Sequence, residues 1–408
     1  MDLDHCFKLL RNQISPLESD LVEWRRHFHQ YPELRFEEYS TAEFISDQLI
    51  DIGLHPKRLC KTGILALLEG SNPGPTVAIR ADMDALPMQD IKEVPYKSNN
   101  PGVTHACGHD VHMAVALGVA KALEGIRKHV AGNIKFIFQP AEEIPSGEVS
   151  GARSLIEEGV LDAPKVEAIL GFHCWPELQV ANIGFQNGCT MASADSFSIS
   201  IEGKASHAGT PQFGKDAISA AAHLITAIQT LLSREISPNE VYTVNIGTIN
   251  GGHSQSIVCD LVEMTGTLRT ANDEVRDYII DRLHTVTNLE LKAMGCNGLI
   301  QFTDHFPPVI NNEYLLNSSV TSLRTVFPPD QVVELKTIPM TAEDFSFYLD
   351  LIPGLYLKLG VGRNSLEEDS FPLHDPRFDI DEQALQIGAL GMSAVLLTIM
   401  NALTKRDI

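Results

Sequence analysis

The stretch that decides the fold is residues 113–139, MAVALGVAKALEGIRKHVAGNIKFIFQ, in which a long apolar segment precedes a short one. Residues 113–127 are rich in Ala, Val and Leu and span about four helical turns, so they predict a buried α-helix. Residues 134–139, IKFIFQ, form a short apolar run with aromatic and β-branched side chains, which predicts a strand. A helix followed by a buried strand is typical of an α/β fold.

The same alternation continues on both sides of this stretch. The further helices that we expect are 21–29, 41–52, 152–160 and 382–403. The further strands that we expect are 63–68, 76–81, 166–172 and 355–361. These elements predict a main domain with a mixed central sheet flanked by helices.

A different order of elements begins near residue 190. Strands and helices there follow the order β-α-β-β-α-β, at 197–202, 216–233, 242–249, 261–269, 273–294 and 299–303. This order predicts an inserted two-layer α+β domain. We therefore expect a main domain of residues 1–189 and 305–408 and an inserted domain of residues 190–304.

The composition excludes several classes of partner. The formal charge of −22 argues against binding of nucleic acid or of an anionic membrane surface. The N-terminus lacks the basic and apolar regions of a signal peptide, and we expect no run long enough to span a bilayer. Seven scattered cysteines, an odd number, favour reduced thiols and a cytoplasmic location.

The densest cluster of chemically reactive residues is His105-Ala-Cys107-Gly-His109-Asp110-Val-His112, directly before the long apolar helix. Cys and His are ligands of borderline-soft divalent metals, and a Gly between them lets both side chains converge. Two other interpretations stay open at this point. Cys107 could be a nucleophile activated by a nearby His, or the polar residues could merely cap the helix.

Other polar residues follow expected strands, where α/β proteins build their sites. Glu142 and Glu143 come directly after residues 134–139, and two such acids can divide metal binding and proton transfer between them. His173 follows the strand expected at 166–172, and His374 lies in a Pro-bounded loop after the strand expected at 355–361. Asp82 and Asp84, two residues apart after another strand, are candidates for orienting ligand imidazoles.

Several motifs in order resemble the aminoacylase and zinc-carboxypeptidase superfamily, in the branch with hippurate hydrolases, auxin-conjugate hydrolases and N-acetyl-diaminopimelate deacetylases. The resemblance covers nearly the whole chain. It rests on residues 24–33 (WRRHFHQYPE), 80–87 (RADMDALP), 105–112, 139–143, 203–209 (GKASHAG), 247–252 and 340–346 (MTAEDFS). It implies hydrolysis of the amide bond of small N-acyl amino acids or related compounds.

The resemblance also implies a site with two divalent metal ions, for which Zn, Mn, Co and Ni all suit the ligands. Cys107 would bridge both ions. Glu143 and His374 would complete one ion, and His109 and His173 the other. Asp82 stands where other branches carry a metal-binding His, so His109 is preferred as the ligand.

Three further roles are implied by the resemblance. Glu142 would be the general base and acid, and Asp84 would orient a ligand. His207 would reach the site of a partner subunit and stabilise the oxyanion, so that the inserted domain would serve as lid and dimerisation domain.

The chain departs from the branch at Ser256 and Cys259, where relatives carry Asn and Pro, so substrate grip is expected to differ. A dipeptidase or carboxypeptidase could use the same site. A non-catalytic binding protein is a third reading, which the retained Glu142 opposes.

Overall fold

The structure, a computed structural model, describes residues 2–144, 147–362 and 371–406. The chain divides into two compact units. The first unit comprises Met1–Thr190, Ile310–Lys336 and Asp344–Ile408, and the second comprises Met191–Val309 and Thr337–Glu343. The short segment Thr337–Glu343 thus belongs with the inserted block, although no sequence pattern indicated it.

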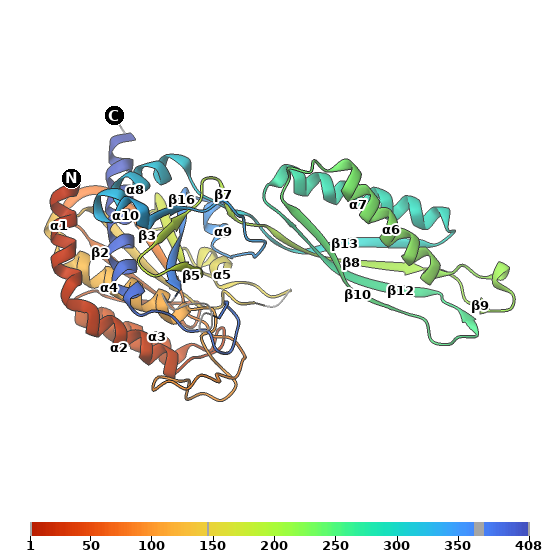
Figure 1. The fold of residues 1–408 in the computed structure, drawn as a ribbon, viewed down its shortest axis with the longest axis horizontal. Helices are drawn as coiled ribbons and strands as arrows, with labels where there is room; N and C mark the ends of the chain where they lie inside the picture. The colour runs from red at the N-terminus through yellow and green to blue at the C-terminus, as the bar shows by residue number, and fades with distance from the viewer. Residues whose placement is uncertain (1, 145–146, 363–370, 407–408) are drawn as a thin grey trace. The chain divides into compact units, whose positions relative to one another are not determined.

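An eight-stranded sheet in the order β1-β2-β4-β3-β5-β16-β6-β15 forms the centre of the first unit (Figure 1). Its strands are β1 Lys57–Leu59, β2 Gly63–Glu69, β3 Asn72–Asp82, β4 Ala131–Gln139, β5 Ala168–Gln179, β6 Ile183–Phe185, β15 Val332–Glu334 and β16 Gly354–Gly362. The four central strands β4, β3, β5 and β16 are parallel, whereas β2 and β6 run antiparallel to their neighbours β4 and β16. The predicted mixed sheet is therefore confirmed.

Helices cover this sheet and share one apolar core with it. They are α1 Leu3–Ile14, α2 Glu18–Gln30, α3 Tyr39–Ile52, α4 His109–Gly125, α5 Gly151–Glu157, α8 Glu313–Val326, α9 Ser346–Leu349 and α10 Gln383–Arg406. The helix expected at 113–127 is α4, which begins four residues earlier, at His109. Gly108 permits this early start because it adopts a left-handed φ of 84°, which a residue with a Cβ rarely does.

The strand expected at 166–172 also differs from the structure. β5 continues to Gln179 because β16 pairs with it beyond the predicted end, with Lys358 opposite His173 and Gly360 opposite Trp175. His173 therefore lies within a strand, not after one. Pairing to a distant segment of the chain decides this point, and a local pattern does not contain it.

One described helix, α10, is long and apolar enough to cross a membrane by length and composition, so the expectation that no such run exists was wrong. However, 78% of the most apolar 18-residue window of α10 is buried inside the protein. Within the first unit α10 packs against α4 and α8. These contacts are typical of the core helix of a globular unit.

The second unit contains a four-stranded antiparallel sheet in the order β10-β12-β8-β13. Its elements are β8 Ala194–Glu202, β9 Ser206–His207, α6 Ala217–Glu235, β10 Tyr242–Gly251, β11 Ile257–Val258, β12 Leu261–Thr270, α7 Asp273–Ala293 and β13 Asn297–Phe306. Two helices, α6 and α7, lie on one face of the sheet and bury its apolar residues (Figure 1). The predicted two-layer order of strands and helices is thus present.

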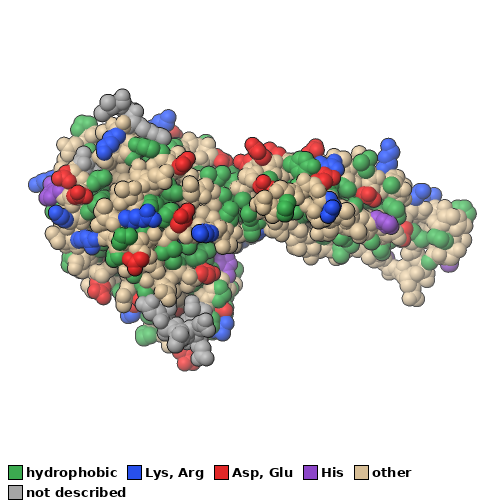
Figure 2. All heavy atoms as spheres, turned by 45° about the horizontal axis from the view of Figure 1, so that its top comes forward, with side chains coloured by type: hydrophobic (Ala, Val, Ile, Leu, Met, Phe, Trp, Pro, Cys, Tyr) green, Lys and Arg blue, Asp and Glu red, His purple; other side chains and the backbone are tan. Residues whose placement is uncertain are grey.

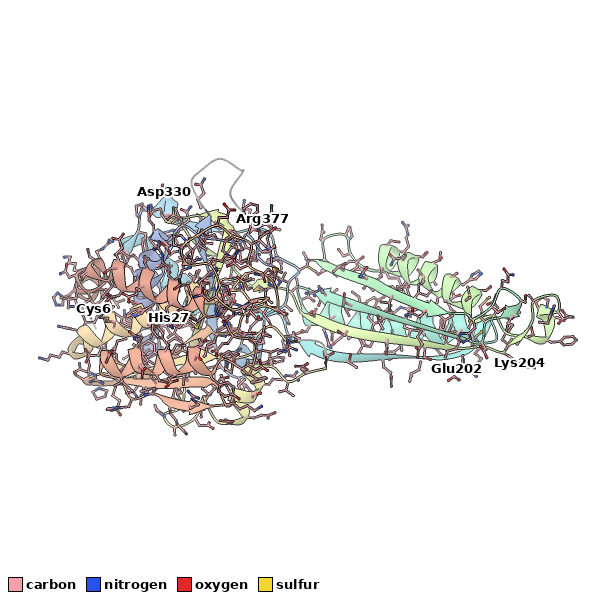
Figure 3. All side chains as sticks on the ribbon, turned by 90° about the horizontal axis from the view of Figure 1, so that it is seen from below. Cys6, His27, Glu202, Lys204, Asp330 and Arg377 are labelled. Carbon is pink, nitrogen blue, oxygen red and sulfur yellow. The ribbon has the colours of Figure 1, made fainter. Side chains whose placement is uncertain are left out.

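Two short elements extend beyond this sheet. β8 ends at Glu202, and Lys204 follows it at the same end of the sheet (Figure 3). There β9 and β11 form a separate two-stranded ribbon. A further pair, β7 Cys189–Met191 and β14 Val309–Ile310, stands where the chain enters and leaves the second unit.

Candidate metal centre

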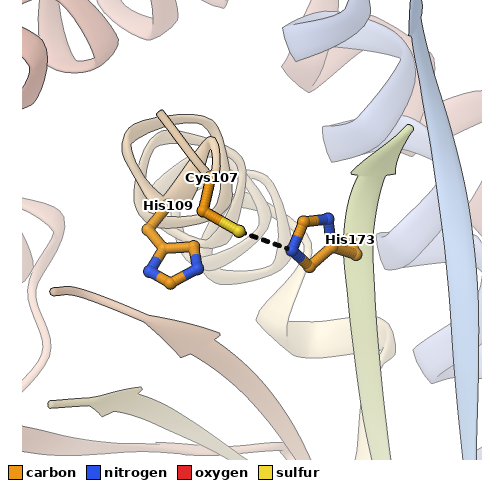
Figure 4. Close-up of side chains that lie close together, drawn as sticks. All are labelled: Cys107, His109 and His173. Carbon is orange, nitrogen blue, oxygen red and sulfur yellow. Dashed lines mark hydrogen bonds between the residues drawn. The ribbon is translucent and has the colours of Figure 1, made fainter. Parts of the chain in front are cut away.

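Cys107 lies in the loop before α4 and belongs to two groups of possible metal ligands. One group is Cys107, His109 and His173, and the other is Cys107, Glu143 and His374; within each, the ligand atoms lie within 4.8 Å of one another. The sulfur is 3.4 Å from His173 Nε2 and 3.2 Å from His374 Nε2. Figure 4 shows the first group, with the sulfur directed at the His173 ring. The structure therefore brings together all five residues that the sequence suggested as ligands.

His109 is held with one nitrogen free for a ligand role. Its Nδ1 lies 2.8 Å from the backbone oxygen of Asp84 and donates to it, so Nε2 is the nitrogen at which a metal ion would take the place of a proton. Nε2 is buried and has no hydrogen-bond partner among the described residues. Burial lowers the pKa of His109, but the Asp82 and Asp84 carboxylates outweigh it and raise the pKa to about 10. The same negative potential favours a bound cation.

His173 and His374 approach the sulfur from different segments. His173, on β5, donates from Nδ1 to the backbone oxygen of Cys174 at 2.7 Å, which turns Nε2 toward Cys107. His374 has a left-handed φ of 64°, and its N–H donates to the oxygen of Ala106 at 2.8 Å, so its loop is fastened beside Cys107. His374 Nε2 also lies 2.8 Å from Glu143 Oε1.

Asp84 positions the two glutamates that follow β4. Its carboxylate accepts hydrogen bonds from the N–H of Glu142 at 3.0 Å and of Glu143 at 2.9 Å. Glu142, Glu143 and His109 form another group whose oxygen and nitrogen atoms lie within 4.8 Å. Asp84 thus orients His109 through its backbone and both glutamates through its side chain.

Glu38 supports the same turn and was not singled out in the sequence. Its Oε1 accepts from the N–H of Ala141, which has a φ of 51°, and its Oε2 accepts from Thr62 Oγ1 at 2.6 Å. Burial, reinforced by the nearby Asp84 carboxylate, raises the pKa of Glu38 to about 7. No spacing pattern links Glu38 to Glu142, because a long stretch of chain separates them.

His112 is a second residue to which sequence reasoning gave no role. It lies one helical turn after His109, and its Nδ1 is 2.5 Å from Asp82 Oδ1. Its Nε2 accepts from the N–H of Cys174 at 2.9 Å, directly beside His173. His109 and His112 are three residues apart on a helix and therefore share one face, so the spacing could have indicated that His112 lies beside the ligands.

The chemistry of the donor set fits divalent metal ions. Burial and the carboxylates of Glu143 and Glu142 raise the pKa of the Cys107 thiol well above its usual range, so a free thiolate is disfavoured there. Bound cations reverse this effect, since a coordinating thiol loses its proton. Thiolate, imidazole and carboxylate together suit Zn²⁺ and similar ions.

His207 belongs to the second unit and is exposed on β9. Its Nδ1 accepts from the N–H of Gly209 at 3.0 Å, and its partner in the ribbon is Ile257 of β11. The neighbouring Ser256 accepts at its backbone oxygen from the N–H of Ala208 at 2.9 Å. Nothing in these contacts assigns His207 a catalytic role.

Comparison with known proteins gives the family. Residues 78–398, which carry every candidate ligand, match the model of peptidase family M20/M25/M40. The chain belongs to this family. The crystal structure of Bacillus subtilis YXEP protein, described as a dinuclear metal binding peptidase from the M20 family, is 33% identical with a TM-score of 0.83, over 95% of this chain and 99% of that chain.

Three curated relatives of this M20 chain are named as a deacetylase, an amino acid hydrolase and a carboxypeptidase. N-acetyl-L-cysteine deacetylase of Bacillus subtilis (strain 168) is 38% identical, over 91% of this chain and 86% of the relative. IAA-amino acid hydrolase ILR1-like 5 of Arabidopsis thaliana is 35% identical over 91% and 85%. Thermostable carboxypeptidase 2 of Saccharolobus solfataricus (strain ATCC 35092 / DSM 1617 / JCM 11322 / P2) is 33% identical over 96% and 98%. This M20 chain is a metal-dependent hydrolase of amide bonds.

Proposed function

We propose that this enzyme removes the acyl group from small N-acyl amino acids, giving a carboxylate and a free amino acid. Two of the relatives named above are a deacetylase of N-acetyl-L-cysteine and a hydrolase of an amino-acid conjugate, which supports this substrate class. The observation that carries the proposal is the sharing of Cys107 between two donor groups beside Glu142.

In this proposal Cys107 would serve both of two divalent ions. Glu143 and His374 would hold one ion with it, and His109 and His173 would hold the other. When bound, such ions polarise the amide carbonyl and make water acidic enough to lose a proton near neutral pH. Zn, Mn, Co and Ni all suit these ligands.

Glu142 moves the proton. Its backbone N–H donates to the Asp84 carboxylate, which fixes the backbone at this position. The Glu142 carboxylate lies close to His109 and Glu143. Glu142 takes the proton of the attacking water and delivers it to the amine nitrogen as the C–N bond breaks. Asp84 acts indirectly, by holding Glu142, Glu143 and His109 in place.

His207 would stabilise the oxyanion in the site of a partner subunit. Residues 248–251 at the end of the edge strand β10 are exposed, and an edge strand offers unpaired N–H and C=O groups to a second copy. We therefore infer a homodimer formed through the second unit, which also serves as a lid.

We place the enzyme in the cytoplasm and expect no nucleic-acid or membrane partner. All seven cysteines are free thiols, which suits a reducing compartment. Acidic and basic side chains are interspersed on the face drawn in Figure 2. The formal net charge of the whole chain is −22, which disfavours binding to nucleic acid or to an anionic membrane.

A carboxypeptidase or dipeptidase activity is the second candidate, because a relative is named as a carboxypeptidase. The nucleophilic-thiol reading of Cys107 loses support from the raised pKa of that buried thiol. The first experiment therefore measures free-amine release from N-acetyl, N-benzoyl and indole-acyl amino acids and from dipeptides, with chelator, with added metal and with neither.

We expect turnover of N-acyl amino acids that chelation abolishes and metal restores. Glu142→Gln should be inactive yet still bind metal, whereas the control Glu148→Gln, on an exposed glutamate, should retain activity. Chelator-resistant turnover would contradict the mechanism. Faster cleavage of dipeptides than of every acyl amino acid would favour the second candidate.

A mixing experiment tests the role of His207 across the dimer. Glu142→Gln and His207→Ala subunits are each expected to be inactive or nearly so. In a mixed dimer one site would combine an intact Glu142 with an intact partner His207, so refolded mixtures should regain about a quarter of wild-type activity. Mixtures that stay as inactive as their components would refute action across the dimer.

A further inference from the structure

Asp344 occupies an unusual place in the chain. It is the first residue of the last segment of the first unit, directly after Thr337–Glu343 of the second unit. Its side chain is fully buried, at 0% exposure. It belongs to the 340–346 motif, MTAEDFS, to which the proposed mechanism gives no role. A buried carboxylate is costly unless its partners compensate it, so its partners indicate what it does.

The Asp344 carboxylate joins three segments, β3, β4 and α5. Oδ1 accepts from Arg80 on β3 at 2.6 Å, and Gln139 Nε2, at the end of β4, lies 2.8 Å from each oxygen. Oδ2 accepts from the N–H of Ala152, at the start of α5, at 3.0 Å. The Glu142–Glu143 turn runs between β4 and α5, so Asp344 fastens both ends of that turn.

A second line of contacts leads from Asp344 to the histidines. Arg80 donates to Asp82 from Nη1, and both side chains are buried. Asp82 in turn bonds His112, and its Oδ1 lies 3.8 Å from His109 Nδ1. Charges therefore alternate from Asp344 through Arg80 to Asp82. Removal of the first carboxylate takes a counter-charge from the buried guanidinium, which also bonds Asp82 and Gln139.

We infer that Asp344 is a positioning residue of the metal centre, acting through Arg80 and Asp82 on the histidines and through Gln139 and Ala152 on the glutamate turn. The inference rests on the metal ligands proposed above. Outer groups that hold ligands usually contribute about 10–100-fold to metal affinity or activity. A purely structural role would instead lower stability and leave the affinity of the folded protein unchanged.

The test measures affinity for Zn²⁺ and Mn²⁺ on the metal-stripped full chain, by competition with a chromophoric chelator, beside kcat and KM of the reloaded enzyme. Asp344→Asn keeps the shape and removes the charge. We expect metal affinity to fall about 10–100-fold and kcat to fall more than KM rises.

Asp195→Asn is the matched control. Asp195 is an equally buried carboxylate, 1% exposed and paired with Arg276 at 2.6 Å, but it lies in the second unit. This variant should lose stability and keep wild-type metal affinity.

Arg80→Lys provides a second readout if Asp344→Asn does not fold, because lysine keeps the charge but loses the guanidinium fork. It should weaken metal affinity in the same direction. Affinity within twofold of wild type in a folded variant would overturn this inference alone. A wild-type chain that binds neither ion would overturn the proposed function as well.

Discussion

Replacing Asp84 with Asn tests how the glutamate turn is held. Asp84 is 1% exposed, and its two side-chain oxygens accept from the N–H groups of Glu142 and Glu143 at 3.0 and 2.9 Å. Asn keeps one acceptor oxygen, so its NH₂ group must face one of the two N–H donors. A buried donor without an acceptor costs about 1–3 kcal/mol. Asp84→Asn should therefore unfold at lower denaturant concentration.

The larger effect is expected on activity. A shift of the turn by about 1 Å would misplace the Glu142 carboxylate, and misplacement of that size costs about 10²-fold in rate. We expect kcat/KM for an N-acyl amino acid to fall about 100-fold, measured by amine release at saturating metal.

Asp90→Asn is the comparison, because Asp90 is a buried carboxylate that also accepts from two backbone N–H groups, those of Lys92 at 2.9 Å and Ser98 at 3.1 Å. It should lose comparable stability and keep activity. Equal activity loss in both variants, or kcat/KM of Asp84→Asn within threefold of wild type, would refute the reasoning.

Three further outcomes follow from the same contacts. Metal at about 100 times its Kd should raise the free energy of unfolding by about 2.7 kcal/mol, measured by denaturant unfolding. An unfolding midpoint that does not change when a chelator is added would contradict a metal centre. Because the pKa of Glu38 is raised from 4.5 to about 7, its contribution to the stability of the metal-free chain is full below pH 4.5 and is lost as pH rises through about 7. Glu38→Gln should flatten that part of a plot of stability against pH, and an unchanged slope would show that another group is responsible. Gly108→Ala should fold poorly and lose metal, as a Cβ there would lie 2.1 Å from Cys174 Sγ at a φ of 84°; normal metal content in this variant would count against the geometry of the loop.

The sequence predicted the main strands of the central sheet and most of the loops that carry the proposed ligands. The apolar runs predicted β3, β4 and β16, and Glu142 and Glu143 follow β4 as expected. The early start of α4 was missed, because Gly108 reads as a loop residue until its left-handed φ is seen to cap the helix. His173 was placed after a strand because pairing of β5 with β16 is not visible in either segment alone.

The supporting residues were the hardest to predict. Glu38 and Asp344 act on the site through contacts that span 103 and 264 positions in the chain, to Ala141 and Arg80. Such contacts are set by the topology of the sheet, which places segments distant in sequence at one edge. A buried carboxylate in a short polar motif carries no local sign of its partner.

The segment Thr337–Glu343 limits how the second unit could be exchanged for that of another family member. The chain passes between the units at Thr190, at Val309, at Lys336 and at Glu343, so the second unit is encoded in two separate stretches of the gene. Exchange of residues 191–309 with those of another family member would leave behind the segment whose Met340 backbone oxygen accepts from Arg269. A chimera that keeps both native pieces of the second unit therefore needs two grafts, and the second graft ends at the residue before Asp344.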